Sequence, residues 1–173
     1  MGKLLGLLIV LGFVAYLVPA PVSHRTASVE IHASREKVWE VLSDLERIPS
    51  WNAAAPSVEF LTQHRQGPGA KYRIPSTPIS RTFEVKDWRS FNRIDYQVTT
   101  DPELTRDHIL VFQIRPAQGR TLVQLDEDYH MRGGYLGHLL DEVYLGPSVE
   151  RSRSAALANL KRLVETGGEI IVN

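Results

Sequence analysis

Residues 29–52 read Val-Glu-Ile-His-Ala-Ser-Arg-Glu-Lys-Val-Trp-Glu-Val-Leu-Ser-Asp-Leu-Glu-Arg-Ile-Pro-Ser-Trp-Asn, and their hydrophobic period changes part-way. Up to Ala33, apolar and polar residues alternate, which is the period of a half-buried strand. From Ser34 onward the apolar residues follow helical spacing, and Ser34 is a suitable N-cap. Pro49 disfavours helical geometry in the residue before it, so a second short helix should end near Ile48. These residues predict one strand followed directly by two short helices.

The same residues resemble those of a known superfamily. The family pattern has a small residue after an apolar strand, a Val-Trp or Val-Phe pair, an Asp, and a Trp close to a pocket mouth. Here these places are taken in order by Ala33-Ser34, Val38-Trp39, Asp44 and Trp51-Asn52. This pattern is similar to that of SRPBCC proteins, which have the START-like or helix-grip fold and include polyketide cyclases, dehydrases and lipid-transfer domains. The ending 157–165 resembles the same family, and the resemblance covers residues 24–166. It implies an elongated apolar cavity between a curved sheet and a long C-terminal helix.

Six further runs alternate between apolar and polar residues or read as short strands, at 58–61, 71–74, 79–86, 93–99, 108–114 and 121–131. They follow one another at hairpin spacing with no helical pattern between them, which predicts an antiparallel meander. Apolar residues recur at helical spacing after Tyr135, so this segment should cover one face of the sheet. Pro147 suits the first turn of a helix, and Gly167-Gly168 suits its end. The predicted class is α+β, with a six- or seven-stranded sheet wrapped around the C-terminal helix.

The N-terminal segment has a different composition from the rest. Residues 4–22 contain no charged or strongly polar side chain. As a helix with a rise of ~1.5 Å per residue they would extend about 28 Å, close to the ~30 Å hydrocarbon core of a bilayer. We therefore expect a single-pass membrane anchor over 1–22, a START-like domain over 23–167 and a tail over 168–173. The short basic N-terminus favours a cytoplasmic start, which would place the domain in the periplasm if the source is bacterial.

Two prolines leave an alternative open for this segment. Pro19 and Pro21 should end the helix near Val18 and leave an apolar core of signal-peptide length. Val18-Pro19-Ala20 is similar to a cleavage site, but Pro21 directly after it would obstruct the peptidase. A cleaved signal-like segment and a peripheral or buried segment therefore remain alternatives to the anchor.

The composition argues against several classes of function. Lys plus Arg equals Asp plus Glu at 20 each, so no charge excess points to nucleic acid as a partner. Cysteine is absent, which removes disulfides, thiolate metal sites and a cysteine nucleophile. The six histidines have no metal-ligand spacing, and no nucleophile elbow or zinc-protease motif occurs. We expect no metal and no cofactor.

Two charged residues have the inward parity of their strands. Arg81 shares a face with Phe83, and Glu127 shares a face with Leu125 and Tyr129. A buried charge without a partner is costly, so each must reach water at a strand end, form an internal ion pair, or serve a function in a cavity. As catalytic candidates, Glu127 would be the acid or base and Arg81 would stabilise enolate charge.

Several aromatic residues could line the cavity with these charges, because their rings combine apolar area with, in Tyr and Trp, a polar tip. The predicted cavity residues are Trp51, Tyr72, Arg81, Phe83, Tyr96, Phe112, Glu127 and Tyr129, with Tyr135 as a further aromatic candidate.

Three functions remain open from the sequence. The favoured hypothesis is membrane-tethered binding or transport of a hydrophobic small molecule, lipid-like or polyketide-like, because burial in a preformed cavity needs only shape and apolar area. The alternative is an enzyme similar to polyketide cyclases or dehydrases, which would need cavity acids and bases within hydrogen-bond reach. A co-chaperone or other protein-binding role, known elsewhere in this broad fold, would require an exposed apolar patch.

Overall fold

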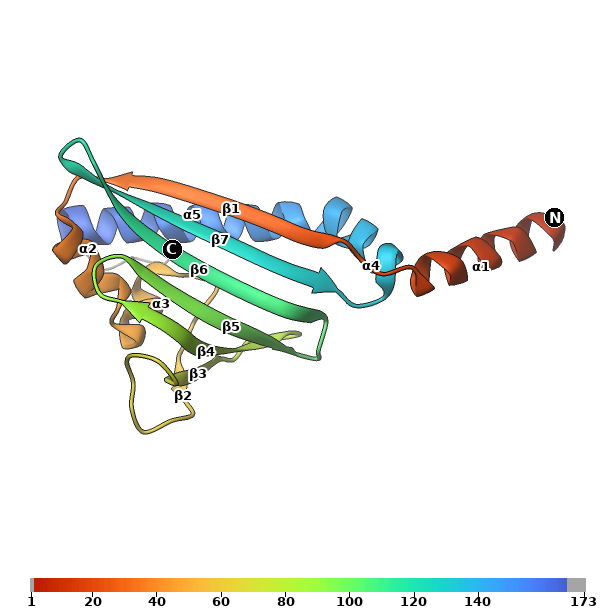
Figure 1. The fold of residues 1–173 in the computed structure, drawn as a ribbon, viewed down its shortest axis with the longest axis horizontal. Helices are drawn as coiled ribbons and strands as arrows, with labels where there is room; N and C mark the ends of the chain where they lie inside the picture. The colour runs from red at the N-terminus through yellow and green to blue at the C-terminus, as the bar shows by residue number, and fades with distance from the viewer. Residues whose placement is uncertain (1, 168–173) are drawn as a thin grey trace.

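A curved antiparallel sheet forms the body of the molecule (Figure 1), which a computed structural model describes for residues 2–167. Within these residues the sheet has seven strands in the order β1-β7-β6-β5-β4-β3-β2. Every pair is antiparallel, and β2 and β1 are the two edges. The strands are β1 (Val22–Ile31), β2 (Glu59–Phe60), β3 (Lys71–Ile74), β4 (Ser80–Arg89), β5 (Arg93–Asp101), β6 (Thr105–Ala117) and β7 (Arg120–Met131). The predicted meander is confirmed.

A long C-terminal helix lies along one face of this sheet (Figure 1). This helix, α5, runs from Gly146 to Thr166 and buries Ala156, Leu157, Leu160, Leu163 and Val164. Pro147 lies in its first turn, where a missing N–H is harmless, and Gly167 caps its end with a left-handed φ of 70°. The prediction of a gripped C-terminal helix is confirmed. The predicted tail 168–173 lies outside the described residues.

The two short helices between the first two strands are also present. Ser34 caps α2 (Arg35–Leu42), and its side chain accepts a hydrogen bond from the backbone N–H of Lys37. A 3₁₀ turn, η1 (Leu45–Arg47), then leads into α3 (Ile48–Trp51). The expected end near Ile48 holds for η1, whose C-cap is Ile48, but the further turn α3 was not predicted. Pro49 lies in the first turn of α3, where proline is tolerated, so it begins a new helical turn.

Two more helical pieces join β7 to α5 (Figure 1). α4 (Gly134–Leu140) begins against the N-terminal segment: Tyr135 donates its backbone N–H to Val18 O at 2.9 Å. A side chain at Gly134 would meet Tyr16 O at 2.2 Å, so only glycine permits this close approach. The next five residues, η2 (Asp141–Leu145), form a π-helical turn, a rare conformation that is often found at functional sites.

The expected membrane anchor is wrong. The N-terminal helix α1 runs only from Gly2 to Leu17, and its 16 residues would reach about 24 Å at ~1.5 Å per residue. Helical geometry ends before Pro19, and Val22 already pairs with His130 in the sheet. Our length estimate counted residues that belong to the turn and to β1. Among residues 2–167, no helix combines the length and apolar character needed to span a bilayer. The predictions of a membrane partner and of an extracytoplasmic domain rested on this span.

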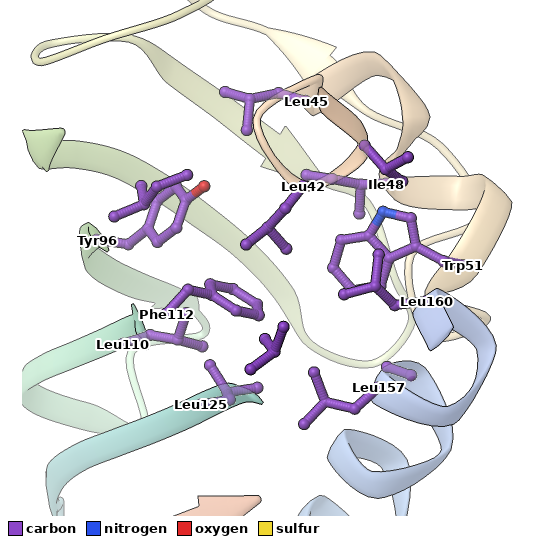
Figure 2. Close-up of a cluster of buried hydrophobic side chains, with 14 of the residues drawn as sticks. Leu42, Leu45, Ile48, Trp51, Tyr96, Leu110, Phe112, Leu125, Leu157 and Leu160 are labelled. Carbon is purple, nitrogen blue, oxygen red and sulfur yellow. The ribbon is translucent and has the colours of Figure 1, made fainter. Parts of the chain in front are cut away.

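The hydrophobic core lies where the short helices, the sheet and α5 meet. Figure 2 shows Leu42, Ile48 and Trp51 facing Leu157 and Leu160 of α5. Phe112 closes the cluster from the sheet side, and all of these side chains are buried. Burial of a side chain of this size stabilises the fold by roughly 1.5–3 kcal/mol. The core therefore secures α5 against the sheet.

Candidate functional site

The space between the sheet and α5 divides into two regions of different packing. The first, here called the filled region, lies beneath α2 and α3. It contains a void of only about 30 Å³. Its walls include Leu42, Trp51, Tyr72, Tyr96, Phe112 and Leu157. The elongated apolar cavity that the family resemblance implied is therefore closed here by side chains.

Aromatic rings account for this filling. Tyr72 stacks on Phe83 with centroids 5.1 Å apart, and Tyr96 meets both rings edge-on. Phe112 extends this row of packed rings, with its ring centroid 6.3 Å from that of Tyr96 and 6.2 Å from that of Trp51. Such edge and stacked pairs stabilise beyond their burial by about 0.5–1.5 kcal/mol each. Five of the eight predicted cavity residues thus pack against one another around the small void.

The second, here called the open region, lies at the end of the sheet where β5 and β7 finish and β4 and β6 begin. It holds a cavity of about 210 Å³. The η2 turn and the first turn of α5 complete its wall. The lining is mixed, with apolar Ile79, Leu104, Met131, Leu145 and Val149 beside polar Arg81, Thr100, Thr105, His108, Glu127, Tyr129, Asp141 and Ser148. The remaining three predicted cavity residues, Arg81, Glu127 and Tyr129, lie here. The further candidate Tyr135 lies on α4 and is exposed.

Glu127 forms a buried ion pair. Arg153 of α5 donates to both its carboxylate oxygens, from Nε to Oε2 and from Nη2 to Oε1, each at 2.9 Å. His108 Nε2 lies 2.7 Å from the same Oε1, and His108 Nδ1 lies 3.2 Å from Thr105 Oγ1. Because a carboxylate only accepts, Nε2 must carry the hydrogen. Of the three alternatives left open for Glu127, the structure contains the internal ion pair, and its partner is Arg153 and not Arg81.

This pairing sets the charge of the carboxylate. Burial alone would raise the pKa of Glu127, but the charge of Arg153 and the hydrogen bonds from His108 and Arg153 outweigh it and hold that pKa well below its usual range. Burial likewise lowers the pKa of Arg153, and Glu127 more than reverses the effect, so the pKa of Arg153 is raised. Both groups are ionised at neutral pH.

A second buried carboxylate, Asp141, has its own set of partners. Tyr129 donates its hydroxyl to Asp141 Oδ2 at 2.9 Å, and Ser23 Oγ donates to the same oxygen at 2.9 Å. Arg25 Nη2 lies 3.2 Å from Oδ2. A Cβ at Gly146 would lie 2.4 Å from Arg25 Nη2, so a larger residue there would displace this guanidinium from its present position. The network ties β1, β7 and the π turn together at the cavity wall.

Arg81 differs from the other charged residues of the cavity. It is half-buried in β4, opposite Thr100 of β5, and it also lines an adjoining hollow of about 180 Å³. Among residues 2–167 no hydrogen bond or ion pair reaches its guanidinium. Burial lowers the pKa of Arg81 and the neighbouring charge of Arg153 lowers it further, while the charge of Glu127 opposes both effects only in part. An anion beside Arg81 would relieve both effects.

Our reading of the sequence missed three residues of this site, and the pattern could have located two of them. His108 has the inward parity of Leu110 and Phe112, and these three side chains are buried in β6. Arg153 lies four residues before Leu157 on the buried stripe of α5. Asp141 is different, because its direction depends on a π turn that no hydrophobic period predicts.

The polar groups of the open region do not form a metal site. Across residues 2–167, three or more His, Asp or Glu side chains nowhere gather in a metal-binding arrangement. The carboxylates of Glu127 and Asp141 are instead occupied by guanidinium, imidazole and hydroxyl donors. The arrangement presents hydrogen-bond donors and one free guanidinium to the cavity.

Comparison with protein families assigns the fold to a known group. A family model described as "Polyketide cyclase / dehydrase and lipid transport" matches residues 24–165. The chain belongs to this family. The SRPBCC resemblance is thereby confirmed, and the match contains every strand except the first two residues of β1, together with α5 except its last residue. No curated protein sequence matches the chain.

Solved structures share the family's fold at low sequence identity. TTHA0849 from Thermus thermophilus is 18% identical, with a TM-score of 0.67 over 85% of this chain and 100% of that one. Ara h 8.0201 is 16% identical, with a TM-score of 0.66 over 83% and 98%. DynU16, from the dynemicin biosynthetic locus, is 16% identical, with a TM-score of 0.63 over 86% of this chain. This chain covers only 49% of the length of DynU16. These likenesses concern the fold alone.

Proposed function

We propose that this family member binds a hydrophobic small molecule in the open region. The observation that supports binding there is the contrast between a 210 Å³ cavity in the open region and a 30 Å³ void in the filled region. An engineered apolar cavity of roughly 150 Å³ accommodates benzene, so the larger hollow has room for a small apolar molecule. Five apolar side chains of the cavity wall provide the contact surface.

The cyclase or dehydrase alternative has less support from the same geometry. A general base must be free to take a proton and needs a pKa near the working pH. Glu127 has its pKa held well below the usual range, and Arg153 and His108 occupy its oxygens. Its role in this proposal is to position the cavity wall. We therefore favour binding over catalysis by Glu127.

Titration with neutral apolar probes tests the proposal. We expect 1-octanol and 2-naphthol to bind the purified protein in isothermal titration calorimetry. Val149→Trp should abolish this binding, because Val149 lines the cavity and the larger ring would occupy it. Ala158→Trp is the matched control, because Ala158 lies on the exposed face of the same helix. Native mass spectrometry of the gently purified protein should also detect an apolar molecule that Val149→Trp loses.

Two results would contradict the proposal. The first is the absence of binding for every apolar probe, charged or neutral, together with no co-purified molecule. The second is equal binding by the wild type and Val149→Trp, which would place any ligand away from the open region.

A further inference from the structure

Arg81 is the guanidinium of the open region that has no direct partner. The two carboxylates of the lining are Glu127 and Asp141. Arg153 pairs with the first, while Arg25 pairs with the second and also with Glu142 and Glu150 outside the lining. Among residues 2–167, no carboxylate forms an ion pair with Arg81. The charge of Arg81 therefore faces the cavity without a bonded counter-ion.

Nearby acidic residues outside the cavity do not fill this role. Asp101 follows Thr100 on β5, but its carboxylate pairs with Arg73 and is 75% exposed. Glu103 pairs with Arg132, and Glu150 lies within reach of Arg25. A half-buried guanidinium without a partner is costly, and a bound anion would remove this cost.

The surroundings of Arg81 contain further donors. Thr100 Oγ1 accepts a hydrogen bond from the backbone N–H of Leu104 at 2.8 Å, which leaves its hydroxyl hydrogen available. Ser148, at the start of α5, lines both the cavity and the adjoining hollow together with Arg81. An anionic oxygen beside Arg81 would therefore have hydroxyl donors from two other elements within the same lining.

Apolar side chains complete the cavity lining. Leu104, Met131 and Val149 provide contact surface without further charges. Benzene with its six heavy atoms fits a cavity of roughly 150 Å³, so 210 Å³ corresponds to about eight to ten heavy atoms. The lining therefore suits a molecule with a short apolar body and one charged end.

We propose that the ligand is an amphiphilic monoanion of about eight to ten non-hydrogen atoms in all, with a short apolar body and a carboxylate-like group bound by Arg81. This inference rests on the proposed function, since it assumes that the open region is the binding site. It adds the sign of the ligand's charge and the residue that recognises it. A planar guanidinium binds a carboxylate through two parallel hydrogen bonds, which gives both affinity and orientation.

A series of probes with one chain and three head groups tests the inference. Octanoate, 1-octanol and octylammonium are titrated into the full-length protein at pH 7. We expect octanoate to bind about tenfold more tightly than 1-octanol, and octylammonium to bind most weakly, because the guanidinium of Arg81 forms a charge-assisted pair with the carboxylate and repels the ammonium group. This comparison uses the wild type and does not depend on the folding of any variant.

Variants of Arg81 then assign the preference to one residue. Arg81→Met should reduce the affinity for octanoate about tenfold and leave that for 1-octanol within about twofold. Arg81→Lys should retain part of the preference, because it keeps the charge and loses the planar fork. Arg73→Met is the matched control, since Arg73 lies on neighbouring β3 in a surface ion pair with Asp101. It should bind all three probes as the wild type does.

The outcomes separate the two proposals. Equal binding of octanoate and 1-octanol by the wild type, or an octanoate preference that survives in Arg81→Met, overturns the anion inference and leaves the hydrophobic site standing. Absence of binding for all three probes overturns both. Loss of the preference in Arg73→Met as well as in Arg81→Met would show a general surface-charge effect and would also overturn it.

Discussion

The filled and open regions are built from the same strands, yet their packing is opposite. In the filled region β4, β5 and β6 contribute the rings of Phe83, Tyr96 and Phe112, which leave a void of about 30 Å³. In the open region β4 and β7 contribute Arg81 and Glu127, and a cavity of about 210 Å³ remains. Aromatic side chains close one half of the sheet–helix space. Charged and polar side chains line the other half, where the cavity remains.

The fold by itself therefore does not set the position of a cavity. The sheet and α5 provide the space, and side-chain volume decides which part of it stays hollow. We infer that the filled region supplies most of the stability and the open region supplies the function. Variants in the two regions should therefore have different consequences.

The greatest loss of stability should come from removing a ring of the filled region. Phe112→Ala should lower the free energy of unfolding by about 3–5 kcal/mol, because a buried ring is replaced by a cavity. Val149→Ala in the open region should cost less than about 1 kcal/mol, since Val149 is half-buried beside an existing hollow. Urea unfolding measures both. Equal losses would show that the two regions do not differ in packing.

Removal of the buried carboxylate should have the next largest effect. Glu127→Gln leaves the cation of Arg153 buried without its counter-ion, so we expect a loss of about 3 kcal/mol in unfolding free energy. The control is Glu84→Gln, whose carboxylate pairs with Lys71 and Lys86 at the surface. It should cost less than about 1 kcal/mol. A loss for Glu127→Gln no larger than this control would mean that the ion pair does not stabilise the open region.

Larger side chains should also affect the stability of the two regions differently, with a smaller difference between the variants. Ala156→Phe places a ring in the filled region, where Ala156 is buried, and should cost about 1–3 kcal/mol through overpacking. Val149→Phe should be tolerated within about 1 kcal/mol, because the cavity can receive the ring. Thermal unfolding followed by circular dichroism measures the pair. The reverse order of stabilities would contradict our assignment of the hollow.

Low pH should reduce the free energy of unfolding, because protonation of Glu127 removes its ion pair with Arg153. Its pKa is lowered in the folded protein from the ordinary value of 4.5, so its stabilisation is complete above this pH and is lost as the pH falls toward the folded-state pKa. Below pH 4.5 this one carboxylate should contribute a loss approaching about 1.4 kcal/mol per pH unit. The unfolding free energy of the wild type should therefore fall more steeply between pH 5 and 3 than that of Glu127→Gln. Parallel curves for the two proteins would refute this role.

The fold followed from the sequence because local patterns agreed with one another. Alternation predicted β3 to the residue, and Ser34, Pro147 and Gly167 marked helix ends that the structure contains. The membrane span failed for a local reason. The apolar run extends to Val22, but the helix ends at Leu17, before Pro19 and Pro21, and Val22 belongs to an edge strand.

Sequence patterns predicted less of the candidate site than of the fold. Parity placed Arg81 and Glu127 on inward faces, but it could not show that Glu127 pairs with Arg153, 26 residues later on a helix. It also could not show how ring volumes add up across four strands. Whether an inward aromatic residue fills space or borders a cavity depends on its neighbours in three dimensions.

A hydrophobic ligand should enter the open region and not the filled region, and methyl NMR can observe both regions at once. The protein is labelled at the methyl groups of Ile, Leu, Val and Met and titrated with 1-octanol. We predict chemical-shift changes at Ile79, Leu104, Met131 and Val149, with the methyl groups of Leu42, Leu110 and Leu157 unchanged. Changes confined to the methyl groups of the filled region would contradict this assignment of the binding site.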